Sequence, residues 1–502
     1  MARGPVTGRK GVVETMSEQD ASRGVMFGGV FRRGGVETGD QAWLRAMLEV
    51  EAALARALER AGLAPAGSGV AVTKAAVPEH FDVAELGTLA ALTGNPVPAL
   101  SRALTKQVPR TAAGAVHRGA TSQDIVDTAA MLMAARGLDV IVADVAAAAR
   151  AAAGLAVKYR STIMIGRTLL QPAVPVTFGL VAAGWLAALD DAAAGLARVR
   201  GDRLAVQFGG AAGTLASLDD AGPRVAALLA EELGLPLPVL PWHTNRLRIV
   251  ELAGALAGAA GTLGKIARDV TLLSQSEVGE VHEGPGDSPG SSSGSLPGSS
   301  PGSSSGDGGS SPRRGGSSAM PQKQNPVAAV AILGCTKRVP GLLATVAAAT
   351  EQEYQRAAGA WHAEWETLAD LLSLTGSAAS WAAELLSGLT VDTGRMSANL
   401  AAAKGLPLAE HVTSLLAGTL GRAAAHDLVA EAGARAVSAG LPLRDVLLGL
   451  PQSAERLEAA GITAEQIESA LDPAGYLGAA AAFVDAALAA HQSAKEQADR
   501  HG

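Results

Sequence analysis

The chain has 502 residues, of which 48% are hydrophobic, enough for a sizeable core in two or three domains. Its 48 Asp and Glu residues outnumber its 41 Lys and Arg residues, and this acidic balance, with only 3% aromatic residues, argues against nucleic acid as a partner. A single cysteine, Cys335, excludes an intramolecular disulfide, and no Cys/His cluster has zinc spacing, so we expect a cytoplasmic protein without a structural metal.

The N-terminal part predicts a tail followed by a helical domain. Residues 1–24 mix polar residues with glycine and contain no continuous apolar run, so we expect a disordered tail and no signal peptide. An N-terminal helical domain is expected over residues 25–114. Its clearest helix, 43–61, gathers its apolar residues on one face, and Glu51 is the charged residue that falls on that face.

Long helices dominate residues 115–368, where we expect a central bundle. The runs 127–159 and 246–277 contain no proline and would each be about 45 Å long as helices. Alternation of the strand type is nearly absent, so the predicted fold class is all-α. Segments such as 146–156 and 252–263 are Ala, Gly and Leu on nearly every face. Helices of this kind must be buried all round, which favours a bundle completed by other subunits of a homo-oligomer.

One uncharged stretch, 168–189, is long enough to suggest a membrane span. Pro172 and Pro175 interrupt it, and the remaining residues, 176–189, are too short to cross a bilayer. We therefore expect a helix inside the helical core and no membrane partner.

Two later regions differ from the long helices. Residues 284–312 are Gly, Ser and Pro with three exceptions, a composition that predicts a disordered insert. From residue 369 to 502 the predicted helices are shorter and are separated by Gly- and Pro-containing breaks, which indicates a small C-terminal helical domain.

Close behind the insert, residues 315–326 read GGSSAMPQKQNP. Two glycines, two serines and two prolines in 12 residues describe a shaped loop rather than a helix. Its backbone N–H groups can form an anion-binding nest, Lys323 can meet a carboxylate, and Asn325 can supply an oriented amide.

The loop resembles the GSSxMPxKxNP signature of the fumarase/aspartase superfamily and matches every fixed position. HRGATSQDIVDTA, residues 117–129, resembles the HxGxTSQDxxDTA segment of the same superfamily. VQFGGAAGTLASL (206–218) and PWHTNRLR (241–248) are similar to one branch, the bacterial 3-carboxy-cis,cis-muconate cycloisomerases. The resemblance implies three helical domains, a long central bundle shared in a homotetramer, and sites built from several subunits.

Members of this superfamily remove a proton beside a carboxylate and expel a group from the neighbouring carbon, or run the reverse. That chemistry requires cations and N–H donors around the carboxylate and one positioned base. The resemblance assigns the base to Ser317 and the stabilisation of charge to Lys323 and Asn325. Ser318 is either a supporting hydrogen-bond partner or a residue that shapes the loop.

A second group of candidates lies in the 117–129 segment and in PWHTNRLR. The resemblance implies that Thr121, Ser122 and Gln123 contact substrate carboxylates. The short polar groups beside His117 at a predicted helix start place that histidine in the site, as a catalytic candidate beside Ser317 and Lys323. The sequence alone leaves the roles of two further candidates, His243 and Arg246, open. His243 is either a substrate contact or a structural hydrogen-bonding residue, and Arg246 either meets a substrate carboxylate or lies on a solvated face.

Two departures from the superfamily pattern bear on the reaction. Adenylosuccinate and argininosuccinate lyases carry a histidine where this chain has Leu169. Opening a lactone expels a carboxylate, whose unperturbed pKa of about 4 lets it leave without an acid, so an apolar residue there suits a cycloisomerase. Tyr354 stands where the branch commonly has a histidine, so no role of that histidine transfers.

The resemblance therefore predicts a cofactor-free cycloisomerase of aromatic catabolism that closes 3-carboxy-cis,cis-muconate, a small tricarboxylate, to 4-carboxymuconolactone. Two alternatives stay open. One is a lyase that releases fumarate from adenylosuccinate or argininosuccinate, which would need a replacement acid for Leu169. The other is a non-catalytic helical scaffold.

Overall fold

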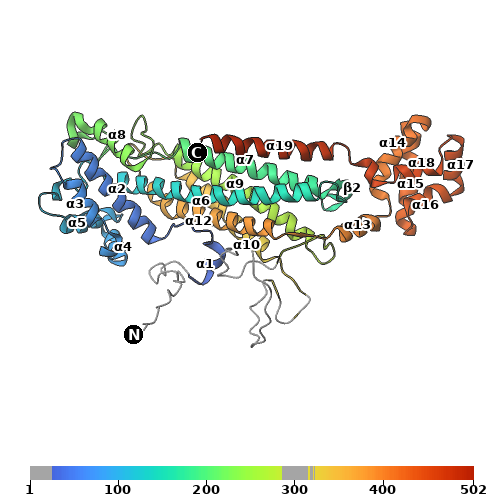
Figure 1. Ribbon diagram of the computed structural model, residues 1–502, viewed down its shortest axis with the longest axis horizontal. Coiled ribbons are helices and arrows are strands. Elements are labelled where there is room, and N and C mark those ends of the chain that lie inside the picture. Colours follow the sequence, from blue (N-terminus) through green and yellow to red (C-terminus); the bar gives the residue numbers. More distant parts are fainter. Residues whose placement is uncertain (1–24, 285–314, 317–319, 321–322, 502) are drawn as a thin grey trace, which may run out of the picture. The chain divides into compact units, whose positions relative to one another are not determined.

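The computed structural model describes residues 25–284, 315–316, 320 and 323–501 (Figure 1). Its contacts divide the chain into two compact units. The first consists of the described residues of Met1–Ile141, with Gly195–Ala257 and Arg338–Ser377; the second consists of Val142–Ala194 and the described residues of Gly258–Lys337 and Ala378–Gly502. The predicted tail at 1–24 and all but Gly284 of the predicted insert at 284–312 lie outside the described residues.

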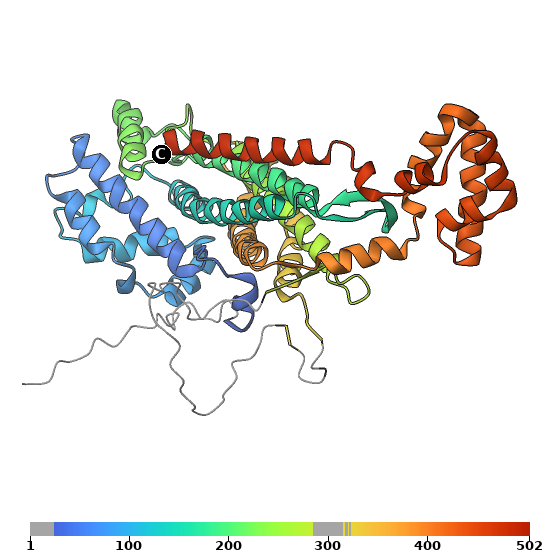
Figure 2. The same ribbon diagram turned by 45° about the vertical axis from the view of Figure 1, so that its right-hand side comes forward.

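Helices form the regular structure of the first unit (Figure 2). Its elements are α1 (Val25–Phe31), α2 (Asp40–Arg60), α3 (Ser68–Ala75), η2 (Pro78–His80), α4 (Val83–Thr93), α5 (Val97–Gln107), η3 (Ala113–Ala115), η4 (Ala216–Ala221), α8 (Gly222–Leu233) and α11 (Val339–Ala348). Four long helices have residues in both units: α6 (Ser122–Lys158), α7 (Phe178–Asp202), α9 (Leu247–Leu273) and α12 (Ala360–Ser387).

The helix predicted at 43–61 is confirmed as α2, and its burial explains the pattern of its sequence. Leu54 and Leu58 belong to one buried cluster with Phe208 and Val225, and α2 packs on α3 and α8. Glu51, the charged residue on the apolar face, is 0% exposed. A buried carboxylate requires partners, and those of Glu51 belong to the candidate site described below.

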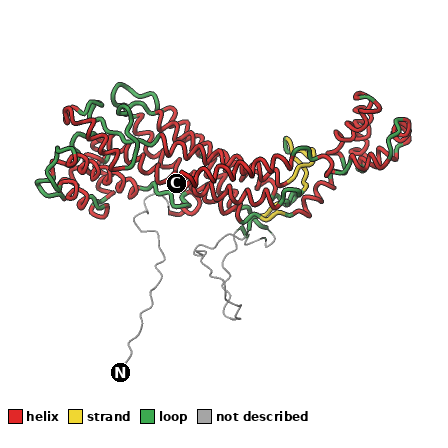
Figure 3. Tube along the Cα trace, turned by 45° about the horizontal axis from the view of Figure 1, so that its top comes forward, coloured by secondary structure: helices red, strands yellow, loops and turns green. Residues whose placement is uncertain are grey.

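Short strands accompany the helices of the second unit (Figure 3). Its elements are β1 (Ile163–Thr168), β2 (Gln171–Thr177), β3 (Val281–His282), α10 (Val327–Thr336), β4 (Thr390–Val391), α13 (Thr393–Ala402), η5 (Leu406–Leu408), α14 (Ala409–Leu420), α15 (Arg422–Ala439), α16 (Leu443–Gly449), α17 (Pro451–Ala459), α18 (Ala464–Ala470), η6 (Pro473–Tyr476) and α19 (Ala480–His501). The predicted all-α class is confirmed.

The hairpin of β1 and β2 is a feature that the sequence did not predict. The strands are antiparallel, and Pro172 and Pro175 lie within β2 opposite Arg167 and Ile165. Proline is tolerated there because neither strand has a second neighbour in this two-stranded sheet. The uncharged stretch therefore enters α7 only at Phe178.

The predicted breaks after residue 400 coincide with helix ends. Gly440 follows α15 with a φ of 63°, α16 ends at Gly449, and α17 begins at Pro451. Helices α14 to α18 enclose their own buried cluster, which includes Val412, Leu428 and Leu447. The three domain boundaries stay a prediction.

By length and composition alone, Ser122–Lys158, Phe178–Asp202, Leu247–Leu273 and Val327–Ala348 could each cross a membrane. Between 33% and 44% of their most apolar windows is buried in the chain. The helix expected at 176–189 is longer, Phe178–Asp202, so the prediction that it is too short to cross a membrane is wrong by length and composition. It buries one face, with Phe178, Trp185 and Leu189, whereas Gly184 is exposed. Much apolar helix surface is therefore left for another molecule to cover.

Candidate active site

Three of the motif segments meet at the start of α6, in the first unit. The carboxylate of Asp124 accepts hydrogen bonds from the backbone N–H groups of Gly209 and Gly210, at 3.0 and 2.9 Å. The same carboxylate accepts from His243 Nε2 at 2.7 Å and from the backbone N–H of Thr121 at 2.9 Å. One buried side chain thereby fastens the segments 117–129, 206–218 and 241–248 together.

Glycine is required where these segments touch. A Cβ on Gly119 would lie 2.6 Å from a methyl carbon of Leu218, and a Cβ on Gly209 would lie 2.7 Å from Pro241 Cβ. Both distances are shorter than carbon atoms can approach without displacement. The glycines of HRGATSQD and FGGAAG therefore serve close packing between motif segments.

A buried ion network lies beside Asp124. Arg246 Nη1 and Nη2 donate to Asp127 at 2.7 and 3.0 Å, and its Nε and Nη2 donate to Glu364 at 3.0 and 2.5 Å. Nη1 also donates to the carbonyl of His243 at 3.4 Å. We call Asp124, Asp127, His243, Arg246 and Glu364 the α6 polar cluster.

The network explains the ionisation of its members. Burial alone would lower the pKa of Arg246, but the charges and hydrogen bonds of Asp127 and Glu364 outweigh it and raise that pKa. Burial raises the pKa of Glu364, while Arg246 acts in the opposite direction. Because all five guanidinium N–H groups have acceptors, none is left for a substrate carboxylate. Arg246 is 2% exposed, so the solvated face considered from the sequence is wrong, and its bonds favour a structural role over a substrate contact.

Two other residues predicted to lie in the site, Gln123 and His243, are also buried here. Gln123 is 0% exposed and donates to Asp127 at 3.1 Å and to the carbonyl of His243 at 2.8 Å. No described residue hydrogen-bonds its Oε1. His243 is 4% exposed and has its Nε2 on Asp124, so the structural alternative for this histidine is the one that its contacts favour.

Thr121 and Ser122 lie at the partly exposed rim of the cluster. The predicted helix start is confirmed, because α6 begins at Ser122. The hydroxyl of Thr121 accepts a hydrogen bond from Arg356 Nη1 at 2.8 Å. Burial lowers the pKa of Arg356, against the raising effect of Asp124 and Asp127.

Arg356 is a candidate that the sequence reasoning did not select. It donates a single hydrogen bond within the part of the chain that the structure describes, and its guanidinium lies 5.7 Å from the ring centre of Trp361. Its other N–H groups are therefore available to an anion. Its position two residues after Tyr354 could have indicated it, although Tyr354 itself differs from the residue common in the cycloisomerase branch.

His117 lies at the same rim, on the opposite end of the HRGAT segment. Its Nδ1 donates to Glu51 Oε1 at 2.7 Å, and its backbone N–H donates to Glu51 Oε2 at 2.9 Å. Burial alone would lower the pKa of His117, but the hydrogen bond and charge of Glu51, with the charge of Asp124, raise it. Its side chain is 24% exposed, so the ring remains accessible.

The signature loop is described in part, within the second unit. Ser317 and Ser318 lie outside the described residues. Gly315 has a φ of 77°, and its carbonyl accepts from the backbone N–H and the side-chain amide of Asn325 at 2.9 and 3.1 Å. Asn325 thus closes the base of the loop. Lys323 is exposed, and no described residue forms an ion pair with it.

Leu169 occupies the tip of the β1–β2 hairpin, together with Leu170. Their φ angles are 50° and 65°, and they are 96% and 71% exposed. No described contact within the chain holds their side chains in a core. Leu169, the apolar residue at the position where the lyases carry a histidine, thus lies on an exposed turn.

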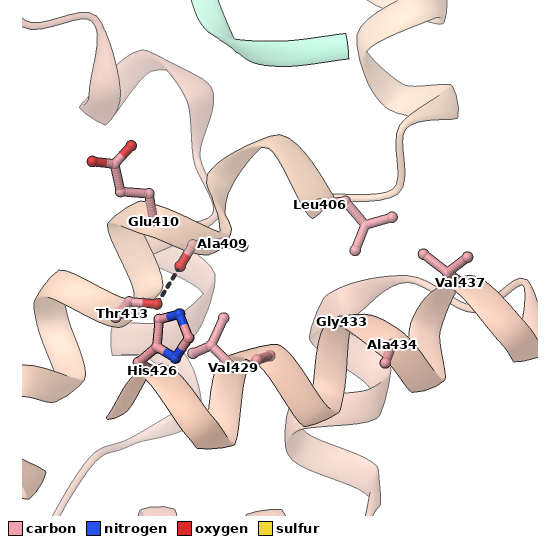
Figure 4. Close-up of a pocket in the computed structure, with 10 residues that line it drawn as sticks. Leu406, Ala409, Glu410, Thr413, His426, Val429, Gly433, Ala434 and Val437 are labelled. Carbon is pink, nitrogen blue, oxygen red and sulfur yellow. Dashed lines mark hydrogen bonds between the residues drawn. The ribbon is translucent and has the colours of Figure 1, made fainter. Parts of the chain in front are cut away.

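A cavity of about 820 Å³ lies between α14 and α15 (Figure 4). Its lining is mainly apolar, with Glu410 and His426 as the ionisable residues. None of the predicted site residues that the structure describes lines it. We therefore do not assign the predicted site residues to this cavity.

Comparisons with known proteins give consistent results. The family model "Lyase" matches residues 36–293, and "Adenylosuccinate lyase C-terminus" matches residues 405–487. The chain is 44% identical over 452 residues to 3-carboxy-cis,cis-muconate cycloisomerase of Bradyrhizobium diazoefficiens, covering 89% of this chain and 94% of that protein. It is 41% identical over 460 residues to nitrosuccinate lyase of Streptomyces davaonensis, covering 89% and 90%. The crystal structure of 3-carboxy-cis,cis-muconate lactonizing enzyme from Pseudomonas putida matches with a TM-score of 0.81 and 40% identity over 94% of this chain and 99% of that one.

Proposed function

The chain belongs to the lyase family of the fumarase/aspartase superfamily, and from this premise we propose that it converts 3-carboxy-cis,cis-muconate to 4-carboxymuconolactone. The superfamily resemblance of its motifs is thereby confirmed, and the chain is an enzyme. The observation that carries the proposed reaction is the 44% identity to a named cycloisomerase over 89% of the chain. This likeness supports the cycloisomerase over a fumarate-releasing lyase and over a scaffold.

In the proposed reaction, a carboxylate oxygen of the substrate adds to a double bond and the carbon beside another carboxylate takes up a proton. The enolate-like charge that develops on that carboxylate requires cations and N–H donors. Lys323 is suited to this role because its ammonium group is exposed and is unpaired among the described residues. We assign proton transfer to Ser317, and supporting roles in the loop to Ser318 and Asn325.

Substrate carboxylates are bound, in this proposal, by the rim of the α6 polar cluster. Thr121, Ser122 and Arg356 contribute hydroxyl and guanidinium groups there, and His117 contributes the accessible edge of its ring. Gln123, His243 and Arg246 hold this rim from below, because their polar atoms bond one another and the two aspartates. The proposed substrate is a small tricarboxylate, so several cationic groups and hydrogen-bond donors are needed.

The reaction needs no acid at the leaving group in the lactone-opening direction, which agrees with Leu169. Nitrosuccinate lyase activity is the second candidate, because a relative with that name is 41% identical over 89% of this chain. A nitro group expelled as nitrite is likewise a stable anion. Leu169 therefore separates both reactions from the amine-expelling lyases but does not separate them from each other.

We propose further that the protein is a cytoplasmic homotetramer. The long apolar helices support assembly, because between 33% and 44% of their most apolar windows is buried within one chain. A mass of about four chains by light scattering is the expected result. A monomer at micromolar concentration would contradict the proposal.

The activity is tested with the purified full chain and three substrates in parallel. Loss of the diene absorbance of 3-carboxy-cis,cis-muconate is the expected result. Nitrite release from nitrosuccinate, without any change of carboxymuconate, would favour the second candidate. Fumarate release from adenylosuccinate alone would contradict both.

A further inference from the structure

Glu51 is a carboxylate in a place where a helix normally carries an apolar residue. It lies on the buried face of α2, among Leu48, Leu54 and Ala55, and is 0% exposed. Removing a carboxylate from water is costly unless hydrogen bonds or opposite charge compensate it. The question is therefore what this carboxylate holds.

Both oxygens of Glu51 bond one residue, His117. Oε1 accepts from the ring Nδ1 at 2.7 Å, and Oε2 accepts from the backbone N–H at 2.9 Å. The backbone of His117 has a φ of 56°, in the left-handed region that non-glycine residues rarely adopt. Two bonds to one buried group fix both the unusual backbone and the orientation of the ring.

This orientation of the His117 ring leaves Nε2 without a bond to Glu51. Because Nδ1 is directed at Glu51, a neutral ring carries its proton on Nδ1, and a charged ring carries the second proton on Nε2. No described residue hydrogen-bonds Nε2, and the side chain is 24% exposed. Nε2 is therefore the atom of His117 that a ligand can reach.

We infer that Glu51 is a positioning residue, which holds His117 so that its Nε2–H donates to a carboxylate of the substrate. This inference rests on the proposed function, since it assigns a role within the same site. The charged groups that act on the ring are Glu51 from α2 and Asp124 from α6, and both favour the imidazolium form. Asp124 is itself bonded to His243 Nε2 and to backbone N–H groups, so its carboxylate is shared, whereas among the described residues the carboxylate of Glu51 bonds only His117.

The pH dependence of substrate binding follows from the protonation of His117. Substrate binding through Nε2–H is complete at low pH and is lost as the pH rises through the raised pKa of His117. Glu51→Gln keeps the shape and an acceptor but removes the charge. We expect this variant to move the loss of binding to lower pH by about one pH unit and to raise KM about tenfold near neutral pH, with a smaller change in kcat.

A neighbouring carboxylate on the same helix provides the matched control. Glu49 is partly exposed and pairs with Arg136 at 2.6 Å, without contact to His117. Glu49→Gln removes the same charge from α2 and should leave KM and its pH profile unchanged. Glu51→Gln in a His117→Gln background should add no further change in KM, whereas additive effects of the two substitutions would contradict positioning.

A measurement that needs no turnover separates this inference from the proposed reaction. In wild-type protein with isotopically labelled histidine, the resonance lost in His117→Gln identifies the ring. At high pH its nitrogen shifts should show the proton on Nδ1, and a proton on Nε2 would overturn the inference whether or not carboxymuconate is a substrate. Failure of wild-type turnover with the expected tautomer would instead contradict only the proposed reaction.

Discussion

In the α6 polar cluster, every side chain bonds another member, and Arg246 alone uses five N–H groups on three residues. In the loop Gly315–Pro326, Asn325 bonds the carbonyl of Gly315, and the backbone N–H of Lys323 donates to the carbonyl of Met320, whereas the ammonium group of Lys323 has no described partner. The cluster is thus preorganised by its own bonds, whereas the ammonium group of Lys323 in the loop is left to pair with an anionic ligand. Substitutions in the cluster should therefore affect stability, and substitutions in the loop should affect turnover.

Ser317→Ala carries the largest expected effect. Because the hydroxyl is the proposed site of proton transfer, kcat for carboxymuconate should fall about 10³-fold or more. The fold and the oligomer should be unchanged by circular dichroism and light scattering. Retention of a tenth of the activity would place the base elsewhere.

Arg246→Met tests the cluster side of the comparison. Removing one partner of a buried ion network leaves the carboxylates of Asp127 and Glu364 without an opposite charge, so the free energy of unfolding should fall by about 3–5 kcal/mol in urea denaturation. Arg200→Met removes an exposed ion pair with Asp139 and should cost less than about 1 kcal/mol. Equal losses in the two variants would show that the cluster does not stabilise the fold.

Lys323→Met tests the loop side. Loss of the proposed charge stabilisation should lower kcat/KM about 100-fold, and the unfolding midpoint should stay at the wild-type value because the side chain is exposed. Lys337, exposed after the end of α10, supplies the control Lys337→Met, which should have wild-type kinetics. A drop in stability for Lys323→Met alone would remove the contrast between the two regions.

Deletion of residues 285–312 should have the smallest effect. Shortening a loop changes its closure entropy by about 1 kcal/mol or less, and the deletion ends before the signature loop. Gly284 is retained because a Cβ there would meet the Gly388 carbonyl at 2.6 Å, which shows close packing. Lost turnover or unfolding of this variant would show that the segment contributes to the site or to the fold.

Local patterns in the sequence were sufficient for the helices. The apolar face of 43–61 predicted α2, and the Gly- and Pro-containing breaks expected after residue 369 coincide with helix ends at Gly440 and Pro451, because these signals act within a few residues. The β1–β2 hairpin was missed because its two-residue turn is Leu169–Leu170, without the glycine or asparagine that usually identifies such a turn.

Motif resemblance located the candidate site but not its partners. His117 and Thr121 were selected from their segment, whereas their partners Glu51 and Arg356 lie 66 and 235 residues away along the chain. Spacing carries no information about such contacts, since tertiary packing determines them. The same limit left the roles of His243 and Arg246 open, and it allowed a solvated face for Arg246, which the structure buries.

The hairpin tip has a consequence for attempts to improve this protein. Leu169 and Leu170 have positive φ angles and are exposed to water. A positive φ angle favours glycine or asparagine, and exposure favours a polar residue. Asparagine and glycine would relieve the turn, so a screen for thermal robustness alone would select them. Such a screen would replace Leu169, the position at which the resemblance puts a histidine in the amine-releasing lyases. Selection for stability alone and selection for the proposed reaction would therefore favour different residues at this turn.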